Sequence, residues 1–287
     1  MQKRFGIAGV QMRVSAFESN VEAMGNYLRH IRTRFPWVRM VLFPELAPLG
    51  PLHKNAEPLP SRTEARLAEF ARETGLWLVP GTLFERVDGP DGSVVYNTMP
   101  VIDPRGEVIA RFRKLFPFRP YERDVKGGTE FCVFDIPDAG RIGVSICYDM
   151  WFPETTRTLA AMGAEVVLHP TMTDTIDRDV ELSIARASAA QNQLYFFDIN
   201  GVGDGGVGRS IVCDPSGHVL HQGDGGTEII PIAVDFERVR HERQWGLRNL
   251  GQPLKSFRDR DCEFLVYQKD KSDFSFLDTL GPLTNPE

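Results

Sequence analysis

The stretch Arg141-Ile-Gly-Val-Ser-Ile-Cys-Tyr-Asp-Met-Trp-Phe-Pro-Glu154 contains the local unit from which the fold can be worked out. Residues 141–146 are apolar enough for a buried strand, and Pro153 suits the first position of a helix that runs to about Met162. Cys147 follows the strand, as in the sharp strand–turn–helix elbows that present a nucleophile. The positive end of the nearby helix predicts a lowered thiol pKa. The alternative is a buried structural cysteine, because cysteine is among the most buried residue types.

Strand and helix signals continue to alternate on both sides of this unit. Hydrophobic periodicity predicts helices at 15–35, 63–74, 153–162 and 178–192. It predicts strands at 5–11, 38–43, 76–84, 94–102, 107–113, 141–146, 165–169, 194–200, 209–213, 218–221 and 229–235. Asp-Pro-x-Gly sequences at 103–106 and 214–217 predict hairpin turns. The pattern favours an α/β protein, with either two sheets packed face to face or one doubly wound sheet.

The sequence carries no obvious domain boundary. No linker or low-complexity segment divides it, so residues 1–287 are predicted to form a single domain. From about residue 255 the periodicity weakens and prolines follow. We expect this tail to be an arm that packs on a neighbouring subunit, or a mobile end.

Composition limits the partners and the compartment. The net charge is −6 and the pI about 5.6, which argues against nucleic acid or an anionic membrane as a partner. No targeting segment is recognised, and no apolar run approaches the ~18 residues of a membrane span. The four cysteines, Cys132, Cys147, Cys213 and Cys262, lack the spacing of a disulfide framework or a structural zinc site. A cytoplasmic location is therefore expected.

Three charged residues follow apolar strands or lie in apolar surroundings. Glu45 ends Val-Leu-Phe-Pro-Glu at the carboxyl end of a predicted strand, where α/β proteins bind ligands. Lys114 follows another strand, and Glu122 comes eight residues later in an aromatic, proline-rich segment. The alternative is that these residues are solvated charges in loops, the usual position of such side chains. The segment at 116–121 is, however, too apolar for an open loop.

Several motifs follow one another along the chain: Phe43-Pro-Glu45, Arg113-Lys114 with Glu122, Ile146 to Glu154, Arg186 and Asn192 in a predicted helix, and Gly208-Arg-Ser210. In this order they resemble the nitrilase superfamily of carbon–nitrogen hydrolases, over roughly residues 5–240. The resemblance implies a four-layer α–β–β–α sandwich and a homodimer or larger assembly.

The resemblance also implies the catalytic residues. It places the triad on Glu45, Lys114 and Cys147, and the second glutamate of the amidase branches on Glu122. Cys147 would attack the carbonyl carbon while Glu45 transfers protons. Lys114 and the backbone N–H of Tyr148 would stabilise the oxyanion.

The expected substrate-binding residues are Tyr148, Trp151, His169 and Thr171. His169 ends a predicted strand, and a core histidine with satisfied hydrogen bonds is the alternative. Many branches that act on carboxylate-bearing substrates have arginine at the position of Trp151, and nitrilases usually continue the cysteine with Trp-Glu. The resemblance therefore favours a small amide that yields ammonia and a carboxylic acid, followed by an N-carbamoyl amine and then a nitrile. Acyl transfer on the same fold and a catalytically silent scaffold remain alternatives.

No cofactor or metal is expected. Residues 201–206 read Gly-Val-Gly-Asp-Gly-Gly, but a strand pattern follows where a dinucleotide fingerprint must open a helix. Asp174, Asp177 and Asp179 lack the glycine and glutamate of a calcium loop, so they are interpreted as a capped, solvated helix start.

Overall fold

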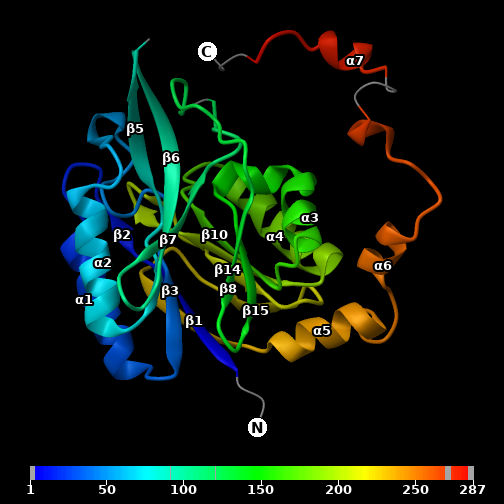
Figure 1. Cartoon of the computed structure of the whole chain (residues 1–287), viewed down its shortest axis with the longest axis horizontal. Coiled ribbons are helices and arrows are strands. Elements are labelled where there is room, and N and C mark those ends of the chain that lie inside the picture. The colour runs from blue at the N-terminus through cyan, green and yellow to red at the C-terminus, as the bar shows by residue number, and fades with distance from the viewer. Residues whose placement is uncertain (1–3, 91, 120, 269–272, 284–287) are drawn as a thin grey trace.

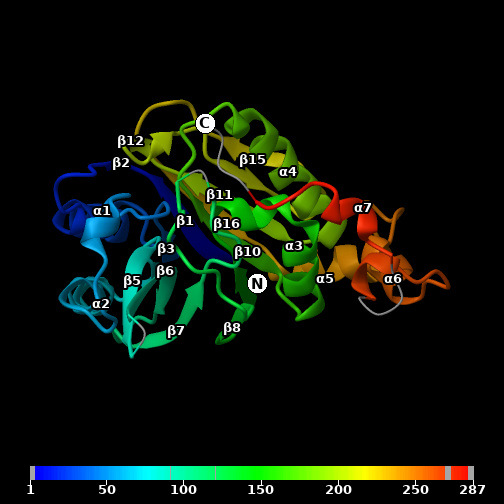
Figure 2. The same cartoon turned by 90° about the horizontal axis from the view of Figure 1, so that it is seen from above.

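The computed structural model describes residues 4–90, 92–119, 121–268 and 273–283. Figure 2 shows four layers, with two sheets in the middle, α1 and α2 outside one of them, and α3 and α4 outside the other. The helices are α1 (Val21–Arg34), α2 (Arg62–Thr74), α3 (Pro153–Ala161), α4 (Asp177–Asn192), α5 (Phe236–Trp245), α6 (Pro253–Arg258) and α7 (Ser275–Asp278). The predicted α–β–β–α sandwich is thus confirmed, and a single doubly wound sheet is excluded.

Within the described residues, the first sheet has seven strands in the order β16-β1-β3-β4-β6-β5, with β7 paired to β6. Their bounds are β1 (Phe5–Gln11), β3 (Val38–Leu42), β4 (Trp77–Val79), β5 (Leu83–Gly89), β6 (Gly92–Ile102), β7 (Val108–Arg113) and β16 (Glu228–Val234). Parallel pairing joins β1, β3 and β4, and their carboxyl ends therefore meet at one edge of the sheet.

The second sheet has six strands in the order β15-β14-β11-β10-β9-β8, again among the residues described. They are β8 (Cys132–Ile136), β9 (Gly140–Val144), β10 (Val166–Thr171), β11 (Tyr195–Asn200), β14 (Ile211–Cys213) and β15 (Val219–Gln222). β10 pairs in parallel with both β9 and β11. A small third sheet contains β2 (Arg13–Val14), β12 (Val202–Gly203) and β13 (Gly206–Val207).

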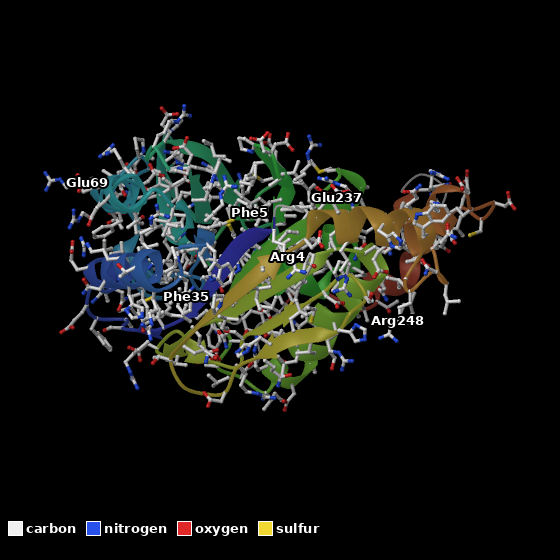
Figure 3. The ribbon with its side chains drawn as sticks, turned by 90° about the horizontal axis from the view of Figure 1, so that it is seen from below. Arg4, Phe5, Phe35, Glu69, Glu237 and Arg248 are labelled. Atoms are coloured by element: carbon white, nitrogen blue, oxygen red, sulfur yellow. The ribbon has the colours of Figure 1, made fainter. Side chains whose placement is uncertain are left out.

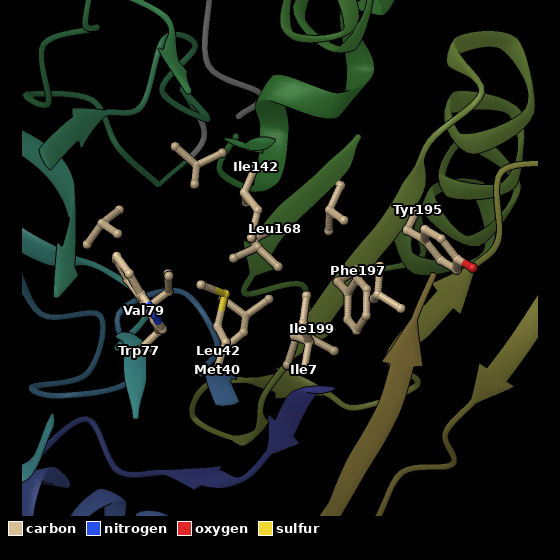
Figure 4. Close-up of a cluster of buried hydrophobic side chains, with 14 of the residues drawn as sticks. Ile7, Met40, Leu42, Trp77, Val79, Ile142, Leu168, Tyr195, Phe197 and Ile199 are labelled. Atoms are coloured by element: carbon tan, nitrogen blue, oxygen red, sulfur yellow. The ribbon is translucent and has the colours of Figure 1, made fainter. Parts of the chain in front are cut away.

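The central core lies between the two large sheets. Figure 4 shows side chains of the first sheet facing side chains of the second: Ile7, Met40, Leu42, Trp77 and Val79 against Ile142, Leu168, Phe197 and Ile199. Apart from Trp77, which is 9% exposed, these side chains have essentially no exposed surface. Burial of apolar area on this scale supplies most of the free energy that favours folding.

The outer faces of the sheets are covered by amphipathic helices. Met24, Leu28 and Ile31 of α1 recur every three or four residues and pack with Phe70 of α2 on the first sheet. α3 and α4 cover the second sheet in the same way. In the view of Figure 3, Phe5 lies in the middle of the molecule, whereas Glu69 of α2 is at the outer edge. α1 to α4 therefore cover the outer faces of the sheets, whereas Phe236 and Val239 of α5 (Phe236–Trp245) join the core between the sheets.

The first predicted helix begins later than expected. It was expected over 15–35, but α1 starts at Val21. The Ser15 hydroxyl accepts hydrogen bonds from the backbone N–H groups of Phe17 and Glu18, which forms a turn instead of a helix. Ser15 N–H in turn donates to the side chain of Asn20, the residue that precedes the helix.

The strand expected over 76–84 is two strands, β4 and β5. The chain turns at Pro80-Gly81, where Gly81 has φ of +78°. A Cβ atom on Gly81 would lie 1.7 Å from the carbonyl oxygen of Pro44, so only glycine fits there. Periodicity cannot reveal such a break, because both strands are buried and apolar.

Gly81→Ala is expected to destabilise the protein by about 2–4 kcal/mol, because it combines a left-handed φ with a backbone clash. Chemical denaturation measures this change. The matched control is Gly75→Ala, since Gly75 also has a positive φ, +66°, but a Cβ there meets nothing within 4 Å. The control should lose only about 1 kcal/mol. Equal losses in the two variants would show that the Pro44 contact carries no cost.

Several elements were not expected from the sequence, among them β2, β8, β12, β13 and α5. β8 is a short strand with only two buried residues. α5 has few apolar residues and is fixed by the side chain of Asp235, which accepts from Arg238 N–H. The Gly201–Gly206 segment forms part of the β12–β13 hairpin and not a helix, and β2 pairs with β12.

In Figure 1, α6 and α7 follow α5 along one side of the molecule. Several apolar side chains after residue 255 are exposed, including Leu265 and Phe276. Residues 269–272 and 284–287 of the expected arm are outside the described residues. No helix in the described part of the chain is long and apolar enough to cross a membrane.

Candidate active site

Three predicted catalytic residues follow strands of the two large sheets. Glu45 comes three residues after β3, Lys114 directly after β7, and Cys147 three residues after β9. The predicted elbow is present: Cys147 has φ of +45° and begins a short 3₁₀ turn, Cys147–Trp151, that leads to Pro153 at the start of α3. A positive φ is unusual for a residue other than glycine and is common at functional sites.

Lys114 is held between two glutamates. Its Nζ lies 2.8 Å from Glu45 Oε1 and 2.7 Å from Glu122 Oε2. All three side chains are buried: Lys114 and Glu45 are each 2% exposed, and Glu122 is 6% exposed. The backbone N–H of Phe118 also donates to Glu122, at 2.7 Å. Buried charges at this density are tolerated only when they are paired and hydrogen-bonded, and here they are.

Asn97 of β6 is a site residue that the sequence did not reveal. Its fully buried Nδ2 donates to Glu45 Oε1 and to Glu122 Oε1, both at 2.8 Å. The backbone carbonyl of Asn97 also accepts the backbone N–H of Lys114, at 2.9 Å. The Asn97 side chain thus fixes both glutamates, and its backbone aligns the chain at Lys114. A single asparagine inside a strand carries no distinctive sequence signal.

The predicted lowering of the Cys147 pKa is wrong. Burial and the negative charge of Glu45 raise the pKa of the Cys147 thiol well above its ordinary value. Lys114 and the N–H of Met172 act in the opposite direction but do not prevail. α3 begins only at Pro153, so the helix end expected to favour the thiolate lies further along the chain. The resting cysteine is a thiol that needs a base.

Glu45 is placed to be that base. Its side chain lines the same cavity as Cys147, and burial together with the nearby Glu122 raises the pKa of Glu45 above its ordinary value. Lys114 opposes this shift. A raised carboxyl pKa brings the proton affinity of Glu45 closer to that of the groups with which it would exchange protons.

Asp149 joins the elbow to the segment after Lys114. It is fully buried, and its Oδ1 accepts from the backbone N–H groups of Leu115, at 3.0 Å, and Phe116, at 2.9 Å. Its Oδ2 accepts from Ile146 N–H at 3.0 Å. Burial raises the pKa of Asp149 to about 7, while these backbone donors act to lower it. Asp149 therefore fixes the residue after Lys114 relative to the residue before Cys147.

Asp149→Ala is expected to lower kcat by about 100-fold, because a small misplacement of Lys114 relative to Cys147 is costly. Stability should also fall, since buried N–H groups lose their acceptor. The matched control is Asp103→Ala, at the opposite end of the β6–β7 hairpin. Asp103 is also buried and accepts from two backbone N–H groups, those of Arg105 and Glu107.

Steady-state kinetics on the folded fraction, set beside denaturation curves, separates the two effects. The Asp103 variant should lose stability while keeping kcat, and Asp149→Asn should recover part of the lost kcat. Wild-type kcat in folded Asp149→Ala would show that Asp149 is only structural.

The predicted catalytic side chains line a cavity of about 380 Å³. Its lining includes Glu45, Lys114, Glu122 and Cys147, with apolar walls from Leu46, Leu52, Phe84, Phe118 and Met172. A smaller cavity of about 20 Å³ adjoins Cys147 and is lined by Tyr148, Trp151, Thr173 and Glu181 among others. Tyr148 and Trp151 thus line the same small cavity as Cys147, and their contact with a substrate stays a prediction.

His169 and Thr171 do not reach either cavity. Both side chains are fully buried, and neither residue lines the cavities beside Cys147. His169 Nδ1 is 2.8 Å from Ser145 Oγ, and burial lowers the pKa of His169 to about 3, so the ring is neutral. Both residues belong to β10, where they support the wall behind Cys147. The structure therefore does not bring these two side chains to the lining around Cys147, and their contact with a substrate stays a prediction.

The expected helix start at Asp174, Asp177 and Asp179 also differs from the structure. α4 begins at Asp177 after Ile176, which provides no side-chain cap. Asp174 lies before the helix and lines both cavities. Among the described residues, no group of three or more His, Cys, Asp or Glu side chains is arranged to hold a metal ion.

The chain is similar to known carbon–nitrogen hydrolases over most of its length. Residues 6–244 match the carbon–nitrogen hydrolase family. A formamidase of Bacillus cereus strain Q1 is 32% identical over 231 residues, which are 75% of this chain and 68% of that protein. A formamidase of Bacillus cereus strain B4264 is 28% identical over 248 residues, 81% of this chain and 73% of that protein.

Solved structures share the fold. A Saccharomyces cerevisiae member of branch 10 of the nitrilase superfamily superposes with a TM-score of 0.76 at 26% identity, covering 85% of this chain and 94% of its own. An amidase from Nesterenkonia sp. AN1, determined with butyramide, gives a TM-score of 0.71 at 23% identity and covers 86% and 97% of the two chains.

Proposed function

Because the chain belongs to the carbon–nitrogen hydrolase family, we propose that Cys147, Glu45 and Lys114 hydrolyse the C–N bond of a small amide. The protein is an amide-hydrolysing enzyme of the nitrilase fold, similar in sequence to formamidases. The observation that carries the residue assignment is the meeting of a thiol, a carboxylate and an ammonium in one cavity. These are a nucleophile, a proton carrier and an oxyanion stabiliser for acyl transfer.

In the first half of the cycle, Cys147 Sγ attacks the carbonyl carbon while Glu45 takes the thiol proton. The oxyanion that forms is stabilised by Lys114 Nζ and by the backbone N–H of Tyr148. Collapse of this intermediate breaks the C–N bond. Glu45 returns its proton to the departing nitrogen, so ammonia leaves and the acyl group stays on Cys147 as a thioester.

In the second half, Glu45 takes a proton from water and the oxygen of that water attacks the thioester carbon. The same two donors stabilise the second oxyanion. When the C–S bond breaks, the carboxylic acid leaves and the proton on Glu45 returns to the Cys147 sulfur. Since one carboxylate serves both halves, its raised pKa suits proton release as well as uptake.

Glu122 and Asn97 act on the charged residues and not on the substrate bond. Glu122 balances the second face of Lys114, and Asn97 fixes the orientation of both glutamates. This arrangement keeps Lys114 protonated, since the two carboxylates raise its pKa well above the ordinary value. A protonated Lys114 is what the oxyanion requires.

We further propose a cytoplasmic homodimer or larger assembly. The support is the set of large apolar side chains exposed on the single chain near the start of α4 and along the C-terminal segment, such as Ile176 and Leu280. Light scattering at micromolar protein concentration tests the assembly, and a monomer would contradict it.

The activity is tested by measuring ammonia release from a panel of short amides, N-carbamoyl amines and nitriles. Amides should be turned over most efficiently, and Cys147→Ala should remove the activity. Preference for a carbamoyl amine or a nitrile would move the protein to another branch of the family. If added hydroxylamine diverts the product from the carboxylic acid to a hydroxamate, the protein is an acyltransferase. If no compound is turned over and Cys147 reacts with a thiol-alkylating reagent no faster than Cys132, the protein is a catalytically silent scaffold.

A further inference from the structure

The cavity is larger than an amide group needs. Its volume of about 380 Å³ is in the range of sites that enclose a whole small-molecule ligand. Beyond the catalytic residues, Leu46, Leu52, Phe84 and Met172 provide an apolar wall. Such a wall suits a methylene chain attached to the amide, because apolar surface is favourably buried there.

The charges on the lining are unbalanced. Among the described residues, the lining of the main cavity holds four carboxylates, those of Glu45, Glu122, Asp174 and Asp204, against one lysine, besides the imidazole of His53. Lys114 is paired with both Glu45 and Glu122. Asp174 and Asp204 therefore have no cation of the lining available to them.

These two aspartates are also without cations from elsewhere in the described chain. Asp204 accepts one hydrogen bond, from Ala16 N–H at 2.9 Å, and forms no ion pair with a described residue. Asp174 and Cys147 line both cavities, and Asp204 lines the main one. Both aspartates are solvent-exposed carboxylates on that lining, so a molecule bound in the main cavity lies in their negative potential.

We propose that the preferred substrate is an amide with a second, positively charged group, an ammonium or a guanidinium, at the end of an apolar spacer. The amide lies at Cys147, the spacer along the apolar wall, and the cation against Asp174 and Asp204. A carboxylate in the same place faces two like charges and is disfavoured. This inference rests on the proposed amide hydrolysis and names the class of substrate for the same cavity.

Three amides with the same spacer provide the test: hexanamide, 6-aminohexanamide and adipic acid monoamide. The ammonium compound should exceed hexanamide in kcat/KM by at least about tenfold, which corresponds to two exposed ion pairs. The carboxylate compound should be the poorest of the three. The kcat/KM advantage of the ammonium compound over hexanamide should shrink as the salt concentration is raised, because dissolved ions screen the exposed charges of Asp174 and Asp204.

Two variants separate recognition from general damage. In the double variant Asp174→Asn with Asp204→Asn, the ratio of kcat/KM for the ammonium compound over hexanamide should fall toward one, mainly through KM. Asp179→Asn is the matched control, because Asp179 lies on α4 nearby but pairs with Arg209 and is not part of either lining. The control should keep the wild-type ratio.

Calorimetric binding of the same three compounds to Cys147→Ala separates this inference from the proposed function. If Cys147→Ala binds the ammonium compound most tightly but the wild type turns over none of the three compounds, amide hydrolysis is contradicted while the preference for a cation is supported. Turnover with equal preference for all three compounds, or with preference for the carboxylate, would overturn the inference and keep amide hydrolysis. A ratio that is unchanged in the double variant would also overturn it.

Discussion

Cys147→Ala is expected to reduce turnover by at least about 10⁴-fold, to the background of the assay. In the proposed cycle the acyl group is carried by Cys147, whereas Glu45 and Glu122 are engaged by Lys114 and Asn97. Loss of a nucleophile in an enzyme of this kind typically costs several orders of magnitude. Ammonia release under saturating amide gives the comparison.

The same substitution should change stability little, within about 1–2 kcal/mol, since one sulfur atom beside a cavity is removed. Cys132→Ala is the matched control, because Cys132 is a partly buried free cysteine in β8 that lies outside the lining around Cys147. Its turnover should equal that of the wild type. Activity in Cys147→Ala would contradict the assignment of the nucleophile.

Lys114→Met is expected to cost both turnover and stability. Removing the ammonium leaves Glu45 and Glu122 as neighbouring buried carboxylates without a cation, a situation that typically costs about 3–5 kcal/mol. Methionine fills a similar volume, so the loss is electrostatic and not a cavity effect. Turnover should fall with it, because the oxyanion loses its charged donor. Denaturation curves and ammonia release measure the two effects.

A second substitution separates them. In Lys114→Met with Glu122→Gln, one of the unpaired charges is removed, so part of the stability should return while turnover stays low. Lys54→Met, at an exposed residue of the short helical turn His53–Asn55, is the control for loss of a lysine and should match the wild type. Wild-type stability of Lys114→Met would show that the buried network does not depend on its cation.

Much of the architecture was accessible from the sequence because the elements are strongly patterned. The β1 strand and the hairpin turn that begins at Asp103 were predicted at their observed positions, since a buried apolar run and Asp-Pro-x-Gly leave few other structures. Glu45, Lys114, Glu122 and Cys147 were predicted because their motifs occur in order, and the structure brings all four to one cavity.

What the sequence did not reveal depends on contacts between distant segments. Asn97 and Asp149 act through hydrogen bonds to groups far away in the chain, and neither lies in a pattern that marks such a role. The break at Gly81 arises from Pro44, and the high pKa of Cys147 from its burial beside Glu45. His169 is hidden from the cavity by the packing of β10, which a position at the end of a predicted strand cannot show.

The most direct test of the account is detection of the acyl group on Cys147 during turnover. Wild-type protein is mixed with a short amide, quenched in acid within milliseconds to seconds, digested with trypsin and measured by mass spectrometry. The peptide that spans residues 142–157 contains Cys147 as its sole cysteine. We expect its mass to rise by that of the acyl group minus one hydrogen, and Glu45→Gln to change how much adduct accumulates. An adduct on another cysteine, or efficient turnover with no adduct at any quench time, would contradict the thioester mechanism.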